Sequence, residues 1–126
     1  METADFLLDS GREMTILEIL KRPGGDMSPR ARKMVLERLI QNGVEILTEA
    51  KAMSVEGDGV VFDRAGVVNW VRGVDSVIVA VGTAPQDVGI PGLEKMGVPV
   101  RWIGDCKAPR KAFDAIHEGF SVGWEI

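Results

Sequence analysis

Cysteine and histidine are nearly absent from this sequence, which contains one of each, Cys106 and His117. A single thiol forms no disulfide, redox-active pair or multi-cysteine metal site within the chain, and this scarcity favours a reducing, cytoplasmic setting. A lone histidine without other ligands is most simply a surface residue. The sequence therefore predicts no metal centre.

Strong charge of one sign and long apolar runs are lacking as well. The chain has 15 basic and 19 acidic residues, spread along its length, which excludes a nucleic-acid stripe or a membrane-surface patch. No segment reaches the roughly 18 apolar residues of a membrane span, and the acidic N-terminus lacks the pattern of a signal peptide. With 126 residues, 45% of them hydrophobic, we expect a soluble globular chain that binds neither nucleic acid nor membrane.

The first part of the chain alternates helix and strand. Residues 2–10 place apolar side chains on one helical face and end at Gly11, a typical C-cap. Residues 13–18 form an apolar, β-branched run bounded by charge, which predicts a buried strand. Helix followed by strand is half of an α/β unit.

The clearest helix follows Ser28. Ser28 suits the N-cap, Pro29 the first helical position, and Gly43 lies just beyond the end. After Gly43 we expect a strand at 44–47. Short alternating runs divided by glycine-containing turns then predict an antiparallel meander over about 50–72.

The last part of the chain contains two more candidate strands. Residues 76–82 are continuously apolar, which favours a central parallel strand, whereas 83–91 contain two prolines and one glycine and read as a linker. A short helical piece at 92–96, a strand at 100–104 and a helix at 109–125 complete the prediction. This order argues for an α/β fold with a largely parallel sheet.

Several motifs occur along the chain: ETADFL, MTILE, GGDM, VIVAVGTAP and IGDC followed by PRKAFDAI. They resemble the C-terminal part of flavin- and NAD(P)H-dependent oxidoreductases. The group that they resemble most is the 2,4-dienoyl-CoA reductase and NADH:flavin oxidoreductase family, relatives of trimethylamine dehydrogenase. The resemblance implies an oxidoreductase that binds NAD(P)H and FAD, with an NAD(P)H domain inserted in an FAD-like domain.

The resemblance also implies a division of the chain. Residues 1–82 would be a partial NAD(P)H-binding domain, 83–91 a linker, and 92–126 the βα return segment of the FAD-like domain. The fold would be an incomplete Rossmann-like three-layer α/β fold that lacks its first strand and glycine-rich loop, because no G-x-G-x-x-G occurs in the sequence. FMN and an iron–sulfur cluster belong only to other parts of such enzymes.

Glu18 closes the first predicted strand and is the candidate residue for nucleotide choice. An acidic residue at this place in a dinucleotide-binding unit accepts hydrogen bonds from ribose hydroxyls and repels a 2′-phosphate, which favours NADH. Arg22 lies close enough to accept a 2′-phosphate instead. The alternative for Glu18 is a solvated glutamate at a strand end.

Two glycine-ended strands carry the other candidate contacts. Gly82 and Thr83 would let the backbone approach a cofactor, although the same residues also suit an ordinary turn before a proline. In the family that the chain resembles, the aspartate at the position of Asp105, directly after Gly104, accepts a hydrogen bond from a ribityl or ribose hydroxyl. Without the strand before it and the helix after it, Gly104-Asp105 would be an ordinary turn.

The helix expected to begin near Pro109 offers free N–H groups around Arg110, Lys111 and Ala112 that would bind an anion, such as a pyrophosphate or a reduced flavin ring. Its alternative is an exposed basic first turn. No general acid, nucleophile or redox centre can be assembled from the chain, so we expect no catalytic residue and an inactive isolated chain that binds a dinucleotide weakly or not at all.

A second interpretation remains open. The chain could be a non-catalytic α/β interaction module that binds a partner strand, or its own copy, through an unpaired sheet edge. Without the first strand, exposed edges and an apolar face favour dimerisation.

Overall fold

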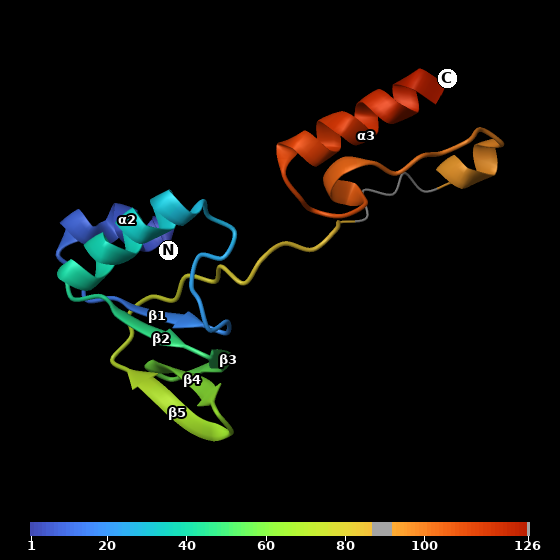
Figure 1. Ribbon diagram of the computed structural model, residues 1–126. Helices are drawn as coiled ribbons and strands as arrows, with labels where there is room; N and C mark the ends of the chain where they lie inside the picture. The colour runs from blue at the N-terminus through green and yellow to red at the C-terminus, as the bar shows by residue number, and fades with distance from the viewer. Residues whose placement is uncertain (87–91, 126) are drawn as a thin grey trace. The chain divides into compact units, whose positions relative to one another are not determined.

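The computed structural model describes residues 1–86 and 92–125. The chain divides into two compact units, Met1–Val77 and Ile78–Ile126. Its elements follow one another in a mixed α/β order (Figure 1). The first unit contains α1 (Glu2–Leu7), η1 (Leu8–Ser10), β1 (Thr15–Glu18), α2 (Pro29–Gln41), β2 (Glu45–Thr48), β3 (Ala50–Glu56), β4 (Gly59–Arg64) and β5 (Val67–Arg72). The second contains η2 (Leu93–Met96), η3 (Gly104–Cys106) and α3 (Ala112–Glu125).

Helix α2 forms as its sequence signals predict. The Ser28 hydroxyl accepts a hydrogen bond from the Ala31 N–H at 3.4 Å, and Pro29 occupies the first helical position. Gly43 follows the helix with a φ of +76°, a left-handed conformation that glycine adopts without steric cost. The predicted start and end of this helix are confirmed. Its Leu39 is fully buried and lies in the core of the unit.

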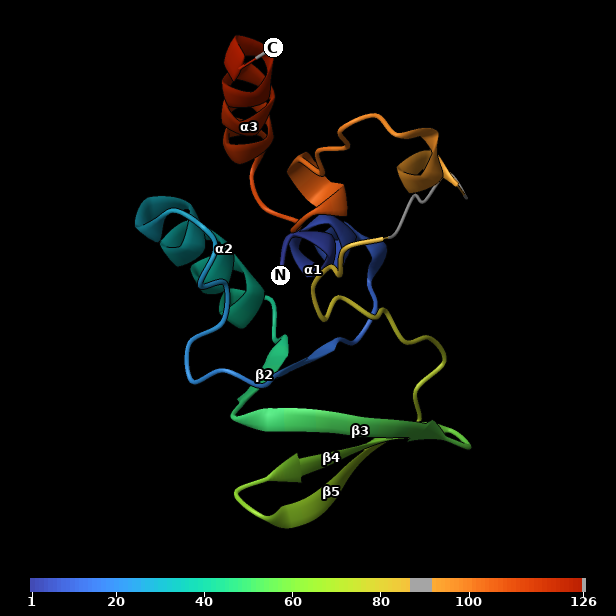
Figure 2. The same ribbon diagram turned by 90° about the vertical axis from the view of Figure 1, so that its right-hand side faces the viewer.

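Strands β1 and β2 pair in parallel, with α2 as the connection between them. The register places Thr15 opposite Glu45 and Glu18 opposite Thr48, so the two strands begin and end together. Figure 2 shows α1 and α2 on one side of this pair and the meander on the other. This β–α–β arrangement confirms the α/β fold and is consistent with part of a Rossmann-like nucleotide-binding domain.

The predicted antiparallel meander is also confirmed, with strand order β3-β4-β5. The β4–β5 turn has two left-handed residues, Ala65 (φ +55°) and Gly66 (φ +80°), as a tight two-residue hairpin requires. Strand β3 contains a β-bulge, since Ala52 lies opposite Phe62 whereas Ser54 lies opposite the next residue, Val61. The central strand β4 contributes Val60, Val61 and Phe62 to the core, which also contains Leu39, Val44 and Ala50.

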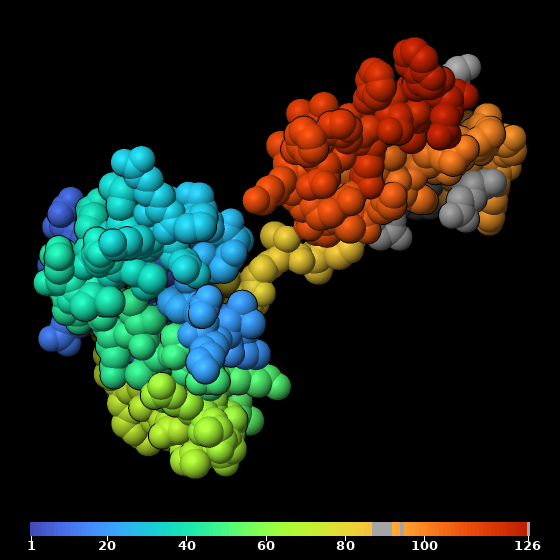
Figure 3. All heavy atoms as spheres, viewed as in Figure 1, coloured from blue at the N-terminus to red at the C-terminus, as the bar shows by residue number. Residues whose placement is uncertain are grey.

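The strand predicted at 76–82 does not form. These residues have no strand pairing, and Val79 and Val81 are 72% and 87% exposed. Figure 3 shows the first residues of the second unit as a narrow run of atoms. A continuous apolar run indicates suitability for a central strand, but a strand also needs neighbours that accept its backbone hydrogen bonds, and the described residues supply none here.

The strand predicted at 100–104 is wrong for the same reason. Ile103 has extended backbone angles, yet no strand pairs with it among the described residues, and Gly104 already begins η3. The helix expected from 109 begins three residues later, at Ala112. The helical piece expected at 92–96 is confirmed as the 3-10 helix η2, whereas residues 87–91 of the predicted linker lie outside the described residues.

None of the helices in the described part of the chain has the length and apolar character that a membrane crossing requires.

Candidate cofactor-binding sites

Each unit contains one candidate site, and each is described by itself. In the first unit the relevant edge is where β1 and β2 end, because ligands of parallel sheets bind beyond the carboxyl ends of the strands. Glu18 and Thr48 are the last residues of these strands and lie opposite one another in register. The sequence thus brings a carboxylate and a hydroxyl together at this edge.

Glu18 is half-buried, and its side chain is partly engaged by its own chain. The carboxylate oxygen Oε1 accepts a hydrogen bond of 2.8 Å from the Leu20 N–H, which shapes the turn after β1. The second oxygen, Oε2, has no hydrogen-bond partner within residues 1–86 and 92–125. Arg22, four residues on, is exposed. The geometry leaves one acceptor oxygen at the strand end for an external donor.

A hollow of about 550 Å³ in the same unit lies at the opposite edge. Its lining includes Thr15 and Glu45, the first residues of β1 and β2, together with Leu8, Gly11, Asn42 and Gly43. It therefore lies at the amino ends of the strands, where nucleotides are not bound in parallel α/β sheets. We assign no cofactor to it.

The candidate site of the second unit is the loop from η3 to α3. Gly104 has a φ of +63°, and a Cβ added to it would lie 3.4 Å from the Ala115 Cβ, so the loop passes close to the helix. Asp105 follows with an exposed side chain. Within the described residues its carboxylate has no hydrogen-bond partner, as a ligand-facing acceptor requires.

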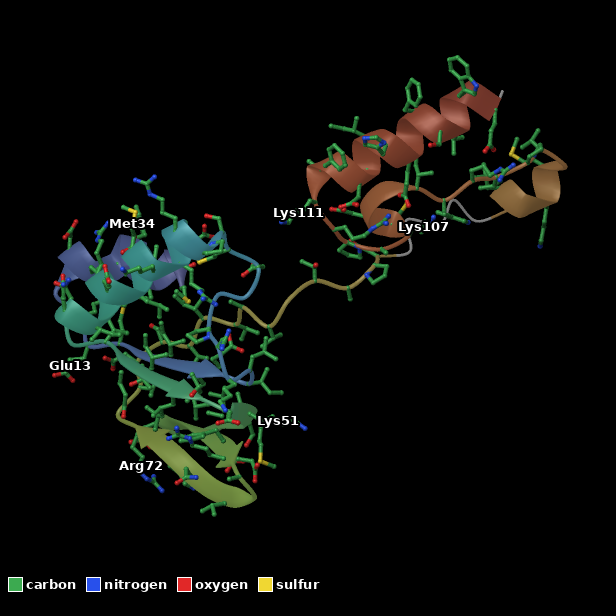
Figure 4. All side chains as sticks on the ribbon, in the orientation of Figure 1. Glu13, Met34, Lys51, Arg72, Lys107 and Lys111 are labelled. Atoms are coloured by element: carbon green, nitrogen blue, oxygen red, sulfur yellow. The ribbon has the colours of Figure 1, made fainter. Side chains whose placement is uncertain are left out.

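Glu118, which no motif of the sequence marks, organises this loop from the second turn of α3. Its Oε2 accepts the Gly104 N–H at 2.7 Å, while its Oε1 contacts Lys107 Nζ at 3.0 Å and Arg110 Nη2 at 2.5 Å. Figure 4 places Lys107 where the chain turns from η3 towards α3. The spacing of Glu118 from Gly104, 14 residues across a loop and two helical turns, gave no local signal.

These contacts change the acidity of Glu118. Hydrogen bonds from Arg110, from the Gly104 N–H and from Lys107 all favour the ionised form and lower the pKa of Glu118 to about 2. The hydrogen bond with Glu118 in turn raises the pKa of Arg110. The carboxylate therefore stays ionised at neutral pH.

The start of α3 differs from the expected anion site in two respects. The Lys111 N–H donates to the Asp114 carboxylate at 3.2 Å, and the Arg110 guanidinium is bound to Glu118. Ala112 is the first helical residue, and Figure 4 shows Lys111 just before it. Gly82, with a φ of +104°, and Thr83 lie elsewhere in the second unit, in the exposed segment without secondary structure.

A smaller cleft of about 280 Å³ adjoins this loop. It lies between residues 101–103 and α3, and its lining includes Trp102, Lys107, His117 and Glu118. The cleft brings aromatic, cationic and acidic groups next to the loop that carries Asp105.

Comparison with known proteins agrees with these features. The family model of the pyridine nucleotide-disulphide oxidoreductases matches residues 1–112. The chain therefore belongs to the pyridine nucleotide-disulphide oxidoreductase family. The match covers most of both units, so the fold and the strand-end site lie within it.

Individual relatives are reductases and oxidases. An NADH oxidase of Thermoanaerobacter brockii is 31% identical over 99% of this chain and 19% of its own length. A metal reductase of Desulforamulus reducens is 30% identical over 92% of this chain and 17% of its own length. Among solved structures, a 2-naphthoyl-CoA reductase complex superposes with a TM-score of 0.71 and 28% identity, over 98% of this chain and 19% of that one. The chain thus spans about a fifth of the length of these proteins.

Proposed function

We propose that this chain supplies cofactor contacts to an NAD(P)H- and flavin-dependent oxidoreductase of the NADH:flavin oxidoreductase and 2,4-dienoyl-CoA reductase type. The bound cofactors supply the redox chemistry, since the nicotinamide carries the hydride and the flavin accepts it. The residues of this chain bind and orient them. The likeness to an NADH oxidase supports NADH as the hydride donor, and the likeness to a 2-naphthoyl-CoA reductase supports an acyl-CoA as the acceptor.

The observation that carries this proposal is the position of Glu18 opposite Thr48 at the carboxyl edge of a parallel β–α–β unit. Glu18 would accept hydrogen bonds from the hydroxyls of the adenine ribose, which favours NADH. Arg22, four residues further on, would instead bind a 2′-phosphate. Gly82 and Thr83, at the start of the second unit, would let the backbone approach a cofactor there.

The second unit would contact the flavin nucleotide. Asp105, after Gly104, would accept a hydrogen bond from a ribityl or ribose hydroxyl, because its carboxylate is exposed and has no partner within the described residues. Lys111 and Ala112 would lie near the charged part of the cofactor, while the Arg110 guanidinium beside them is paired with Glu118. Together these residues fit FAD, while FMN and an iron–sulfur cluster would belong to other parts of a complete enzyme.

The test is a titration of the isotope-labelled chain with NADH, NADPH and FAD, followed by the backbone amide signals. We expect NADH to shift signals around Glu18 and Thr48, and FAD to shift those around Asp105, both only at millimolar concentrations because no glycine-rich phosphate loop is present. Shifts spread over the whole surface, or no shifts at saturating nucleotide, would contradict the proposal.

A second candidate function is an interaction module that forms dimers. The exposed valines of the 76–82 segment favour it, since Val79 and Val81 lie largely in solvent. Sedimentation at increasing concentration separates the two. A size that rises with concentration, together with no response to any nucleotide, would support the module.

A further inference from the structure

A single carboxylate fastens the loop that carries Asp105. Glu118 uses its Oε2 atom for the Gly104 N–H at 2.7 Å and its Oε1 atom for Lys107 and Arg110, at 3.0 and 2.5 Å. These three partners are the first residue of η3, the residue just after η3 and a residue near the start of α3. The loop is therefore fixed at both ends and at its centre.

The fastening determines how Asp105 is presented. Asp105 lies between Gly104 and Lys107, two of the tied residues, and its own side chain is exposed. The loop is further closed by hydrogen bonds of 3.1 Å from the Lys107 and Ala108 N–H groups to the Gly104 carbonyl. A carboxylate on such a closed turn loses little conformational freedom when it accepts an external donor.

The ion pairs of Glu118 also determine the charge of the loop surface that a ligand would contact. Lys107 and Arg110 are the first two cations after Asp105 in the sequence, and both are paired with Glu118, whose side chain is only 18% exposed. A paired cation attracts a phosphate less than a free one, because Glu118 partly cancels its charge and occupies its donors. The loop is thus suited to a neutral, hydroxyl-bearing ligand group.

We propose that Glu118 is the positioning and specificity residue of this loop: it holds Asp105 in place as a free acceptor and withholds Lys107 and Arg110 from phosphates. The identity of the ligand group as the ribityl or ribose hydroxyls of a flavin nucleotide rests on the proposed function. The role of Glu118 in ordering the loop and pairing its cations does not.

The experiment compares the isotope-labelled chain with its Glu118→Gln variant, with Glu125→Gln as the control. Glu125 is on the same helix and pairs with Arg101 at 3.6 Å, but it does not contact the loop. In Glu118→Gln we expect the Gly104 amide to lose at least roughly tenfold of its protection from hydrogen exchange, because a hydrogen bond to a charged acceptor is replaced by one to a neutral amide. Glu125→Gln should leave that protection unchanged.

Binding of inorganic pyrophosphate measures whether Glu118 withholds Lys107 and Arg110 from phosphates. Glu118→Gln frees two cations, so we expect it to bind pyrophosphate at least roughly tenfold more tightly at low salt than the unmodified chain, with shifts at Lys107 and Arg110. An equal affinity would overturn the specificity role. Unchanged exchange of Gly104 would overturn the positioning role.

A double variant tests the proposal if the Glu118→Gln substitution unfolds α3. In the double variant Lys107→Gln and Arg110→Gln, the Gly104 amide should report a Glu118 titration that moves up from about 2 towards the ordinary value of 4.5. A Gly104 signal that follows no carboxylate titration would overturn the inference. Because these readouts use no flavin, a failure of FAD to shift the Asp105 signals would count against the proposed function and leave the role of Glu118 standing.

Discussion

The Glu118 carboxylate accepts the backbone N–H of Gly104 at 2.7 Å, although the two residues are 14 positions apart in the sequence. The contact joins the start of η3 to the middle of α3, the only α-helix in the described part of the second unit. It is possible because Gly104 adopts a left-handed φ and has no side chain between the loop and Ala115. Gly104 and Glu118 are therefore a matched pair, and changing either should disturb the same loop.

Acid should release this loop. The pKa of Glu118 is lowered from 4.5 to about 2 by its hydrogen bonds, so the stabilisation is fully present above about pH 4.5 and is lost as the pH falls through about 2. We expect helical circular dichroism to decrease over this range. Glu118→Gln, which lacks the titrating group, should show a smaller decrease, and an identical acid profile in both proteins would contradict the assignment.

Replacement of Gly104 should destabilise the second unit. Gly104→Ala places a side chain at φ +63° next to Ala115, and a left-handed non-glycine residue costs about 1–2 kcal/mol. The control is Gly123→Ala, where an added Cβ meets nothing within 4 Å in the helix and should stabilise α3 by up to about 1 kcal/mol. Thermal unfolding should thus move in opposite directions for the two variants.

Leu39 and Ile40 are neighbours on α2 with opposite surroundings, which makes them a matched test of the first unit's core. Leu39 is fully buried and Ile40 is 64% exposed. Leu39→Ala should lower the free energy of unfolding by about 2–5 kcal/mol, because it leaves a cavity. Ile40→Ala should change it by no more than about 0.5 kcal/mol. Urea unfolding followed by the amide signals of residues 1–77 measures both, and similar losses would place the core elsewhere.

Glu18 and Arg22 should affect nucleotide choice in opposite ways. Glu18→Gln weakens the hydrogen bonds that residue 18 accepts from the ribose hydroxyls, and it removes the negative charge that repels a 2′-phosphate. We therefore expect weaker NADH binding and unchanged or stronger NADPH binding. Arg22→Gln should weaken NADPH binding alone. Amide-shift titrations with each nucleotide measure the four affinities. If either substitution changed the affinity for both nucleotides equally, that residue would have no role in nucleotide choice.

Local signals in the sequence predicted the first unit well. The cap at Ser28 and the glycine after α2 act over a few residues, and the alternation in 50–72 needs only neighbouring strands that follow in sequence. These features depend on contacts within one short stretch. They therefore appear in the structure close to where the sequence places them.

The second unit was harder to predict because its structure depends on distant partners. The runs at 76–82 and 100–104 have the composition of buried strands, but the described residues provide no strand beside them. Residue type alone also gave no reason to select Glu118 over the other acidic residues, since its role arises from a loop that returns to the helix. Asp105, by contrast, follows from the resemblance of the IGDC and PRKAFDAI motifs to a known family, and its role stays a prediction.

The bulge in β3 has a consequence for chain length. Met53 is the additional residue between Ala52 and Ser54 and has no counterpart on β4. Its deletion would leave each remaining residue of β3 opposite its present partner, whereas loss of a residue from β4 would turn the inward side chains beyond it towards solvent. Related chains that are one residue shorter at this point can thus keep the same buried face.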